Sequence, residues 1–114
     1  MASIRYSATS LWELNAIEDY IAYRLDNPPA ARGAVGTITR SIGMLKSFPE
    51  MGKKVEHIEE LTGEGYRYLV SGRYVVFYQV IADEVMILRI MHGCRDIEAA
   101  LQSWVLSTGC DTLQ

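Results

Sequence analysis

The chain has 114 residues, of which 49% are hydrophobic and 22% are charged, and its formal net charge is −3. This balance is typical of a single soluble globular domain that buries a modest core. A protein that binds mainly through phosphate contacts is usually basic, so the charge disfavours nucleic acid as the dominant partner and leaves room for a local basic patch. Cys94 and Cys110 are too few for a disulfide framework and lack metal-ligand spacing.

No apolar run reaches the roughly 18 residues of a membrane helix, and the first residues lack the apolar stretch of a signal peptide. We therefore expect a cytoplasmic protein without a membrane partner, a metal or a cofactor. Because the sequence shows no internal repeat and no linker, we assign one domain to residues 1–106. Residues 107–114 are expected to form a flexible tail.

A short strand and a helix are predicted near the N-terminus. Residues 3–7 alternate between polar and apolar side chains, so we expect a strand that adds to the edge of a sheet. The helix that follows begins at Ser10, which fits a capping box, or one turn earlier at Ser7. Its apolar residues recur at spacings of three and four, which predicts one buried stripe made of Leu11, Leu14, Ile17, Ile21 and Leu25.

A second helix is predicted after the Asn27-Pro28-Pro29 break. Asn27 can cap this helix, and Pro28 suits its first position because no hydrogen-bonded N–H is needed there. The apolar side of the helix consists of Ala34, Val35, Ile38, Ile42, Leu45 and Phe48. Two such helices joined by a short loop form an antiparallel hairpin that can cover one face of a sheet.

Residues 66–92 predict a three-stranded antiparallel meander. β-Branched and aromatic residues dominate three runs, which are separated by short polar pairs at 71–72 and 82–83. Two-residue loops at both places set the register, with Val70 opposite Arg73 in the first hairpin.

This register predicts which side chains share a face. Arg67, Val76 and Arg89 lie in one row across the three strands, and Arg73 lies opposite His92. Because the helical hairpin covers only one face, the second face is expected to remain an apolar surface of a size that monomers rarely tolerate. We expect a partner segment to lie across it and to contact Val75, Phe77, Met86, Leu88 and Ile90.

After the meander, Asp96 is the expected N-cap of a short terminal helix over residues 97–104. The predicted fold class is therefore α+β. It combines an N-terminal strand, an α-helical hairpin packed on an antiparallel β-meander sheet, and a short C-terminal helix.

The element order and three motifs resemble the RelE/ParE toxins of bacterial type II toxin–antitoxin systems, over residues 3–101. The matching motifs are Pro49-x-Met51-Gly52-Lys53, Gly72-x-Tyr74-Val75-Val76-Phe77-Tyr78 and Ile87-Leu88-Arg89-Ile90-Met91-His92-Gly93-Cys94-Arg95-Asp96. The resemblance implies the RelE/ParE-like fold and a cognate antitoxin as the segment that covers the second face. It also implies that operator DNA is contacted only through that antitoxin.

The family contains two activities, and the resemblance is closer to the ParE-like branch. RelE-like members cleave mRNA in the ribosome, whereas ParE-like members block DNA gyrase by binding. RelE-like members often carry Arg where this chain has Val75 and Tyr where it has Leu101, while the Arg after the glycine is kept as Arg95. The His-Gly-x-Arg-Asp ending that starts at His92 is ParE-like. We therefore expect an inhibitor of gyrase that acts by stoichiometric binding and not by catalysis.

Two alternatives stay open, namely a ribosome-dependent mRNA endoribonuclease and a degenerate member that only forms complexes and regulates its operon. A metal-free nuclease would use His92 for proton transfer and Arg95 to hold the phosphate. Arg73, Lys53 and Lys54 are the candidate contacts to the target or to phosphate.

Four residues are assigned structural roles: Arg67, Arg89, Tyr78 and Asp96. The two arginines could form a phosphate clamp that flanks Val76. We favour instead that they anchor carboxylates of the helices against the sheet, because an arginine on an otherwise apolar face needs an acceptor.

Overall fold

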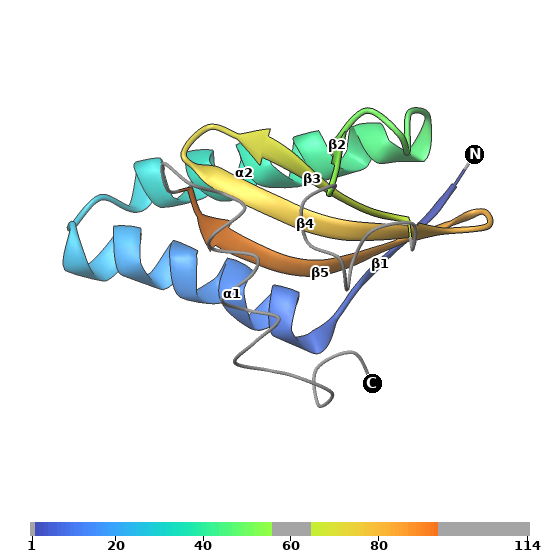
Figure 1. Cartoon of the computed structure of the whole chain (residues 1–114). Coiled ribbons are helices and arrows are strands. Elements are labelled where there is room, and N and C mark those ends of the chain that lie inside the picture. Colours follow the sequence, from blue (N-terminus) through green and yellow to red (C-terminus); the bar gives the residue numbers. More distant parts are fainter. Residues whose placement is uncertain (1, 56–64, 94–114) are drawn as a thin grey trace.

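The computed structural model describes residues 2–55 and 65–93. Within these ranges two helices lie against one face of a five-stranded mixed sheet, whose strand order is β1-β5-β4-β3-β2 (Figure 1). This arrangement confirms the predicted α+β class and the helical hairpin on a β-meander. The predicted terminal helix and its cap Asp96 lie outside the described residues.

The N-terminal segment forms an edge strand and starts the first helix. β1 (Ser3–Tyr6) pairs in parallel with β5 (Glu84–His92), which confirms the predicted edge position. α1 (Ala8–Asp19) begins after Ser7, whose hydroxyl oxygen accepts a hydrogen bond from the Ser10 N–H at 3.0 Å. The helix thus starts at the earlier of the two predicted positions.

The helical hairpin continues through a π-helical turn, η1 (Tyr20–Arg24), into α2 (Pro28–Gly43). The side-chain oxygen of Asn27 accepts a hydrogen bond from the Ala30 N–H at 3.2 Å, and proline occupies the first helical position. Both predictions for the start of this helix are therefore confirmed. A 3₁₀ turn, η2 (Met44–Lys46), ends it.

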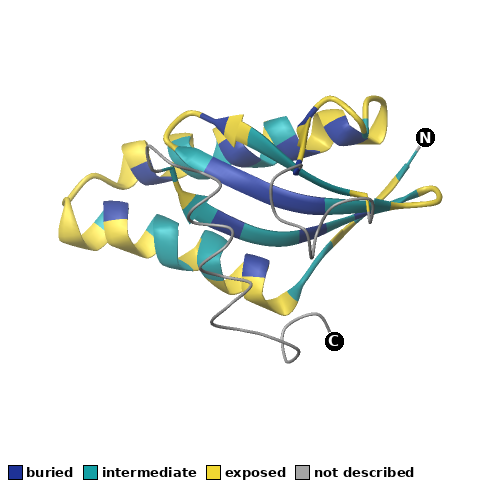
Figure 2. Ribbon diagram, in the orientation of Figure 1, coloured by how far each residue is buried: buried dark blue, intermediate teal, exposed yellow. Residues whose placement is uncertain are grey.

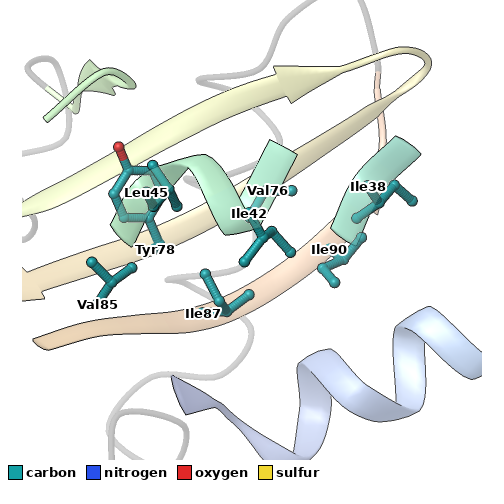
Figure 3. Packing of buried hydrophobic residues seen from close by; sticks show 8 residues of the cluster. All are labelled: Ile38, Ile42, Leu45, Val76, Tyr78, Val85, Ile87 and Ile90. Atoms are coloured by element: carbon teal, nitrogen blue, oxygen red, sulfur yellow. The ribbon is translucent and has the colours of Figure 1, made fainter. Parts of the chain in front are cut away.

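The main hydrophobic core lies between α2 and the two central strands, β4 (Tyr74–Ile81) and β5. Its buried side chains point towards one another in Figure 3; they are Ile38, Ile42, Leu45, Val76, Tyr78, Val85, Ile87 and Ile90. Leu14 and Ile17 of α1 pack against this cluster. Figure 2 shows buried residues along β4 and β5 and on both helices. The predicted apolar stripes are correct in the middle of each helix and wrong at three terminal positions, which are exposed: Leu11, Leu25 and Phe48.

β3 (Tyr66–Ser71) and β4 form the first hairpin, and β2 (Lys53–Lys54) pairs with the outer edge of β3. The loop comprises residues 72–73, one residue later than predicted, so Ser71 lies opposite Tyr74. The glycine of this loop takes a φ of +60°, a conformation that costs glycine little. The pairing of β3 with β4 is thus shifted by two residues, so the predicted cross-strand neighbours in this hairpin are wrong. A shift of two residues leaves each side chain on its predicted face of the sheet, because the side-chain period of a strand is two.

The second hairpin has the predicted loop at residues 82–83, but its pairing shifts at a bulge in β5. Tyr78 lies opposite Ile87, whereas the preceding residue of β4 lies opposite Arg89, so Leu88 is an extra residue on β5. A bulge of one residue moves the side chains beyond it to the other face of the sheet.

The bulge overturns two predictions for the end of β5. Ile90 lies in the core under the helices and not on the second face, so it is not available for partner binding. His92 lies opposite Tyr74 and not opposite Arg73.

The N-cap residue of α1 and one residue in the middle of that helix bind backbone groups at the bulge. The Ser7 hydroxyl donates to the Leu88 carbonyl at 3.0 Å, and the Glu13 carboxylate accepts from the Ile90 N–H at 2.8 Å. The Ser7 N–H also donates to the Ile87 carbonyl at 2.9 Å. Because buried backbone groups without partners are costly, these hydrogen bonds tie the position of α1 to the bulge.

Replacing Ser7 tests this connection. Ser7→Ala removes the helix cap and the donor to Leu88, so we expect it to lower the free energy of unfolding by about 1–2 kcal/mol in urea titrations. Thr9→Ala, at an exposed position in the first turn, is the matched control and should change that energy by less than about 0.5 kcal/mol. Equal effects of the two substitutions would contradict the role of Ser7.

Candidate functional site

Arg89 binds a carboxylate of α1. Its Nε and Nη2 atoms donate to Glu13 Oε2 at 3.0 and 2.8 Å, and the second carboxylate oxygen accepts the Ile90 N–H. The Glu13 side chain is 12% exposed, so the guanidinium group offsets part of the cost of burying a carboxylate. The contact is the one that a structural role of Arg89 requires, and the role itself stays a prediction.

Arg67 and Tyr78 hold one loop against the sheet. The Tyr78 hydroxyl donates to the Pro49 carbonyl at 2.9 Å and accepts from the Gly52 N–H at 3.0 Å. Arg67 Nη1 donates to the carbonyls of Glu50 and Gly52 at 3.0 and 2.8 Å. These two side chains therefore organise the first of the three motifs from its buried side.

The arrangement that a phosphate clamp of the two arginines would need, a row of Arg67, Val76 and Arg89, is absent from the described sheet. Arg67 lies opposite Tyr78 on β4, whereas Arg89 lies beside the bulge, so the predicted row is wrong. Val76, which the clamp would have flanked, is completely buried in the core. Both guanidinium groups bind acceptors of the protein itself.

The Tyr78 hydroxyl keeps its proton at neutral pH. Burial raises its pKa above the ordinary value of 10.0, and this effect outweighs the Gly52 hydrogen bond, which lowers the pKa. The loop also approaches the sheet too closely for a side chain at Gly52. A Cβ atom there would lie 2.5 Å from the Tyr78 hydroxyl oxygen and 2.6 Å from the Tyr68 carbonyl oxygen.

A cleft of about 850 Å³ opens between the two helices and the hairpin end of the sheet. Its lining residues are Ala16, Ile17, Tyr20, Ile21, Leu25, Ala30, Ala34, Thr37, Ser71, Gly72, Arg73, Tyr74 and His92. We call it the helix cleft. The cleft is not among the predicted sites. The signal for it in the sequence is the pair of alanines at positions 30 and 34, one helical turn apart, where larger residues would have filled the space.

Two predicted site residues, Arg73 and His92, lie at the sheet end of the helix cleft. The His92 ring meets the Tyr74 ring edge to face, with centroids 5.5 Å apart. Arg95, the second residue of the nuclease alternative, lies outside the described residues.

Lys53 and Lys54 lie far from this end of the sheet. On β2, Lys53 pairs with Tyr68 and Lys54 pairs with Arg67. Tyr68 lies opposite Phe77 of β4, whereas His92 lies opposite Tyr74, three residues away on the same strand. Three residues span roughly 10 Å along a strand, and the three strand spacings from β2 to β5 add roughly 14 Å across the sheet. The predicted target contacts are therefore two separate groups and not one phosphate site.

The second face of the sheet is not the exposed apolar surface that we predicted. Val75 is 3% exposed and Phe77 is completely buried, while Met86 and Leu88 are half-buried. Phe77 belongs to a second hydrophobic cluster, in which the Tyr66 ring stacks on it with centroids 5.6 Å apart. Of the predicted antitoxin contacts on this face, only Met86 and Leu88 are partly exposed.

The chain matches the family model described as the ParE toxin of the type II toxin–antitoxin system parDE, over residues 4–97. The chain belongs to the ParE toxin family. Among solved structures it is similar to a chain described as the chromosomal ParDE TA system from P. aeruginosa, with a TM-score of 0.66 and 25% sequence identity. That similarity covers 81% of this chain and 96% of the other. No curated protein matched this chain.

The family match confirms the ParE-like toxin that the sequence predicted. In the part of this ParE-family chain that the structure describes, no helix is both long and apolar enough to cross a membrane.

Arg89→Ala tests the structural role of the arginine in this ParE-family toxin. The substitution leaves the largely buried Glu13 without its cation, so we expect the free energy of unfolding to fall by roughly 1–3 kcal/mol in urea titrations. Arg5→Ala is the control, because Arg5 is 66% exposed and lies 3.8 Å from Glu84, and its loss should cost less than about 1 kcal/mol. An Arg89→Ala protein of unchanged stability that has lost toxicity would give Arg89 a direct role in function.

Proposed function

We propose that this ParE-family toxin arrests growth by binding DNA gyrase and that a cognate antitoxin neutralises it. The observation that carries the proposal is the match to the ParE toxin model over residues 4–97. The ParDE description of the similar solved chain supports the antitoxin as partner. Operator DNA is contacted only through the antitoxin in this scheme.

The position of the charged side chains supports binding over catalysis. Val75 stands where RelE-like nucleases often carry an arginine, and its burial leaves no exposed group there. Arg67 and Arg89 are engaged by the protein, and the exposed cations at Lys53 and Arg73 belong to separate parts of the sheet. A nuclease that works without a metal needs its cation and its proton-transfer group around one phosphate.

The helix cleft is our candidate for the main antitoxin contact. It is concave and mostly apolar, with a few polar groups at one end, which is the usual composition of a pocket that receives an anchoring side chain. Tyr20 and Leu25 are exposed lining residues that extend the apolar surface of the cleft towards solvent. Met86 and Leu88 on the second face remain the secondary candidates.

Induced expression with two parallel readouts tests the target. We expect supercoiling by purified gyrase to be inhibited at near-stoichiometric toxin concentrations, and we expect no codon-phased mRNA fragments above background. Since His92 has no catalytic task in this proposal, His92→Ala should arrest growth as the unchanged protein does. Codon-phased fragments that disappear in both His92→Ala and Arg95→Ala, with the fold intact by circular dichroism, would support the nuclease instead.

Filling the helix cleft tests the antitoxin contact. The antitoxin is expected to be the product of a neighbouring reading frame. Ala34→Leu places a larger side chain in the cleft at little cost to the helix, so we expect the Kd for this antitoxin to rise about tenfold or more. Gly33→Ala is the matched control on the same helix, because a Cβ atom there meets nothing within 4 Å. Unchanged affinity in Ala34→Leu would place the antitoxin elsewhere.

A further inference from the structure

An exposed apolar surface with basic residues lies at the end of α2 that is remote from the helix cleft. Three large apolar side chains are exposed there, and Phe48 is the most exposed of them at 61%. They are Met44, Phe48 and Met51, which line a shallow hollow of about 570 Å³. We call this feature the 44–54 surface, because the same segment of the chain contains three exposed lysines: Lys46, Lys53 and Lys54.

The 44–54 surface is rigidly supported. The Tyr78 hydroxyl and the Arg67 guanidinium bind the loop from inside, and backbone bonds of 3.0 and 3.1 Å link Phe48 to the residues at positions 44 and 51. A loop that is already ordered loses little conformational entropy when a partner binds. The exposed apolar side chains therefore have the arrangement of a pre-organised contact surface.

The charge of this surface indicates an acidic partner. The chain as a whole has a net charge of −3, yet this segment has three exposed lysines and a single carboxylate, that of Glu50. That carboxylate lies 3.6 Å from Arg67, so a cation of the protein already balances it. An apolar centre with a charged rim is the usual organisation of a protein interface, and rim charges mainly steer association.

The 44–54 surface is separate from the helix cleft. The cleft uses α2 between Ala30 and Thr37, whereas the surface begins at Met44. At 1.5 Å per residue, seven residues separate the two sites by about 10 Å along the helix axis at their nearest points. A partner segment that fills the cleft therefore leaves the hollow around Phe48 open to a second partner.

We propose that the 44–54 surface is where the toxin docks on its target. The matching site on the target is an apolar side chain that enters the hollow, with carboxylates nearby that attract the exposed lysines of the segment. This inference rests on the proposed function, in which the toxin acts by binding a target protein, and it goes further by naming the residues and the chemistry of that contact.

Phe48→Ser tests the apolar part of the contact. Because Phe48 is mostly exposed, the substitution should leave the melting temperature and the affinity for the antitoxin nearly unchanged. We expect half-inhibition of gyrase supercoiling, and growth arrest in cells, to require about tenfold more toxin or more. Tyr23→Ser is the matched control, since Tyr23 is 79% exposed on η1 and lies outside both surfaces, and it should behave as the unchanged protein does.

Charge reversal tests the basic part. Lys53→Glu combined with Lys54→Glu should slow association with the target and reduce the dependence of the association rate on salt concentration. Arg32→Glu on an exposed part of α2 is the control for a general change of charge.

Each outcome decides the proposal. Full toxicity of Phe48→Ser would overturn it, as would a parallel loss of antitoxin binding, which would assign the surface to the antitoxin. If the toxin without substitutions arrests growth but does not inhibit gyrase, only the proposal that gyrase is the target is overturned. Loss of growth arrest in Phe48→Ser would in that case still support the docking surface. An unchanged toxin that arrests no growth would overturn both.

Discussion

The bulge in β5 is the constraint on which the rest of the structure depends. One extra residue, Leu88, turns the last part of the strand over, so that Ile90 enters the core and Arg89 reaches α1. The Glu13 carboxylate binds both residues that follow the bulge: one oxygen accepts from the Arg89 guanidinium group, and the other accepts from the Ile90 N–H. A largely buried carboxylate is tolerated only when its oxygens have such partners, so the ion pair, the bulge and the helix position require one another.

The elements and their order were predictable because they depend on local patterns. Ser7 and Asn27 cap the helices through contacts with residues three positions away, and the spacing of apolar residues marks the buried sides of both helices. The register was less predictable. A two-residue loop that contains Gly72 can comprise residues 71–72 or residues 72–73, and the sequence does not distinguish the two. Likewise, nothing in the composition around Leu88 distinguishes a bulge from a regular strand.

For the candidate functional residues, too, some features could be predicted from the sequence and others could not. The need of buried arginines for acceptors follows from desolvation, so protein partners for Arg67 and Arg89 could be expected, while the choice of backbone carbonyls in one case and Glu13 in the other depends on the register. The burial of Phe77 was not predictable from two helices covering one face, because aromatic neighbours such as Tyr66 on the adjacent strand cover it in part. The helix cleft could not be predicted from hydrophobic periodicity, because it depends on alanines whose small side chains leave space between the elements.

Gly52 has a consequence for how this fold can vary during evolution. Any side chain there would bring a Cβ atom against the Tyr78 hydroxyl and against the backbone carbonyl of Tyr68. A shorter residue at position 78 would relieve the first collision and leave the second, because a carbonyl of β3 moves only with its strand. No single compensating substitution therefore frees position 52, and a relative without this glycine must route the whole loop along another path over the sheet.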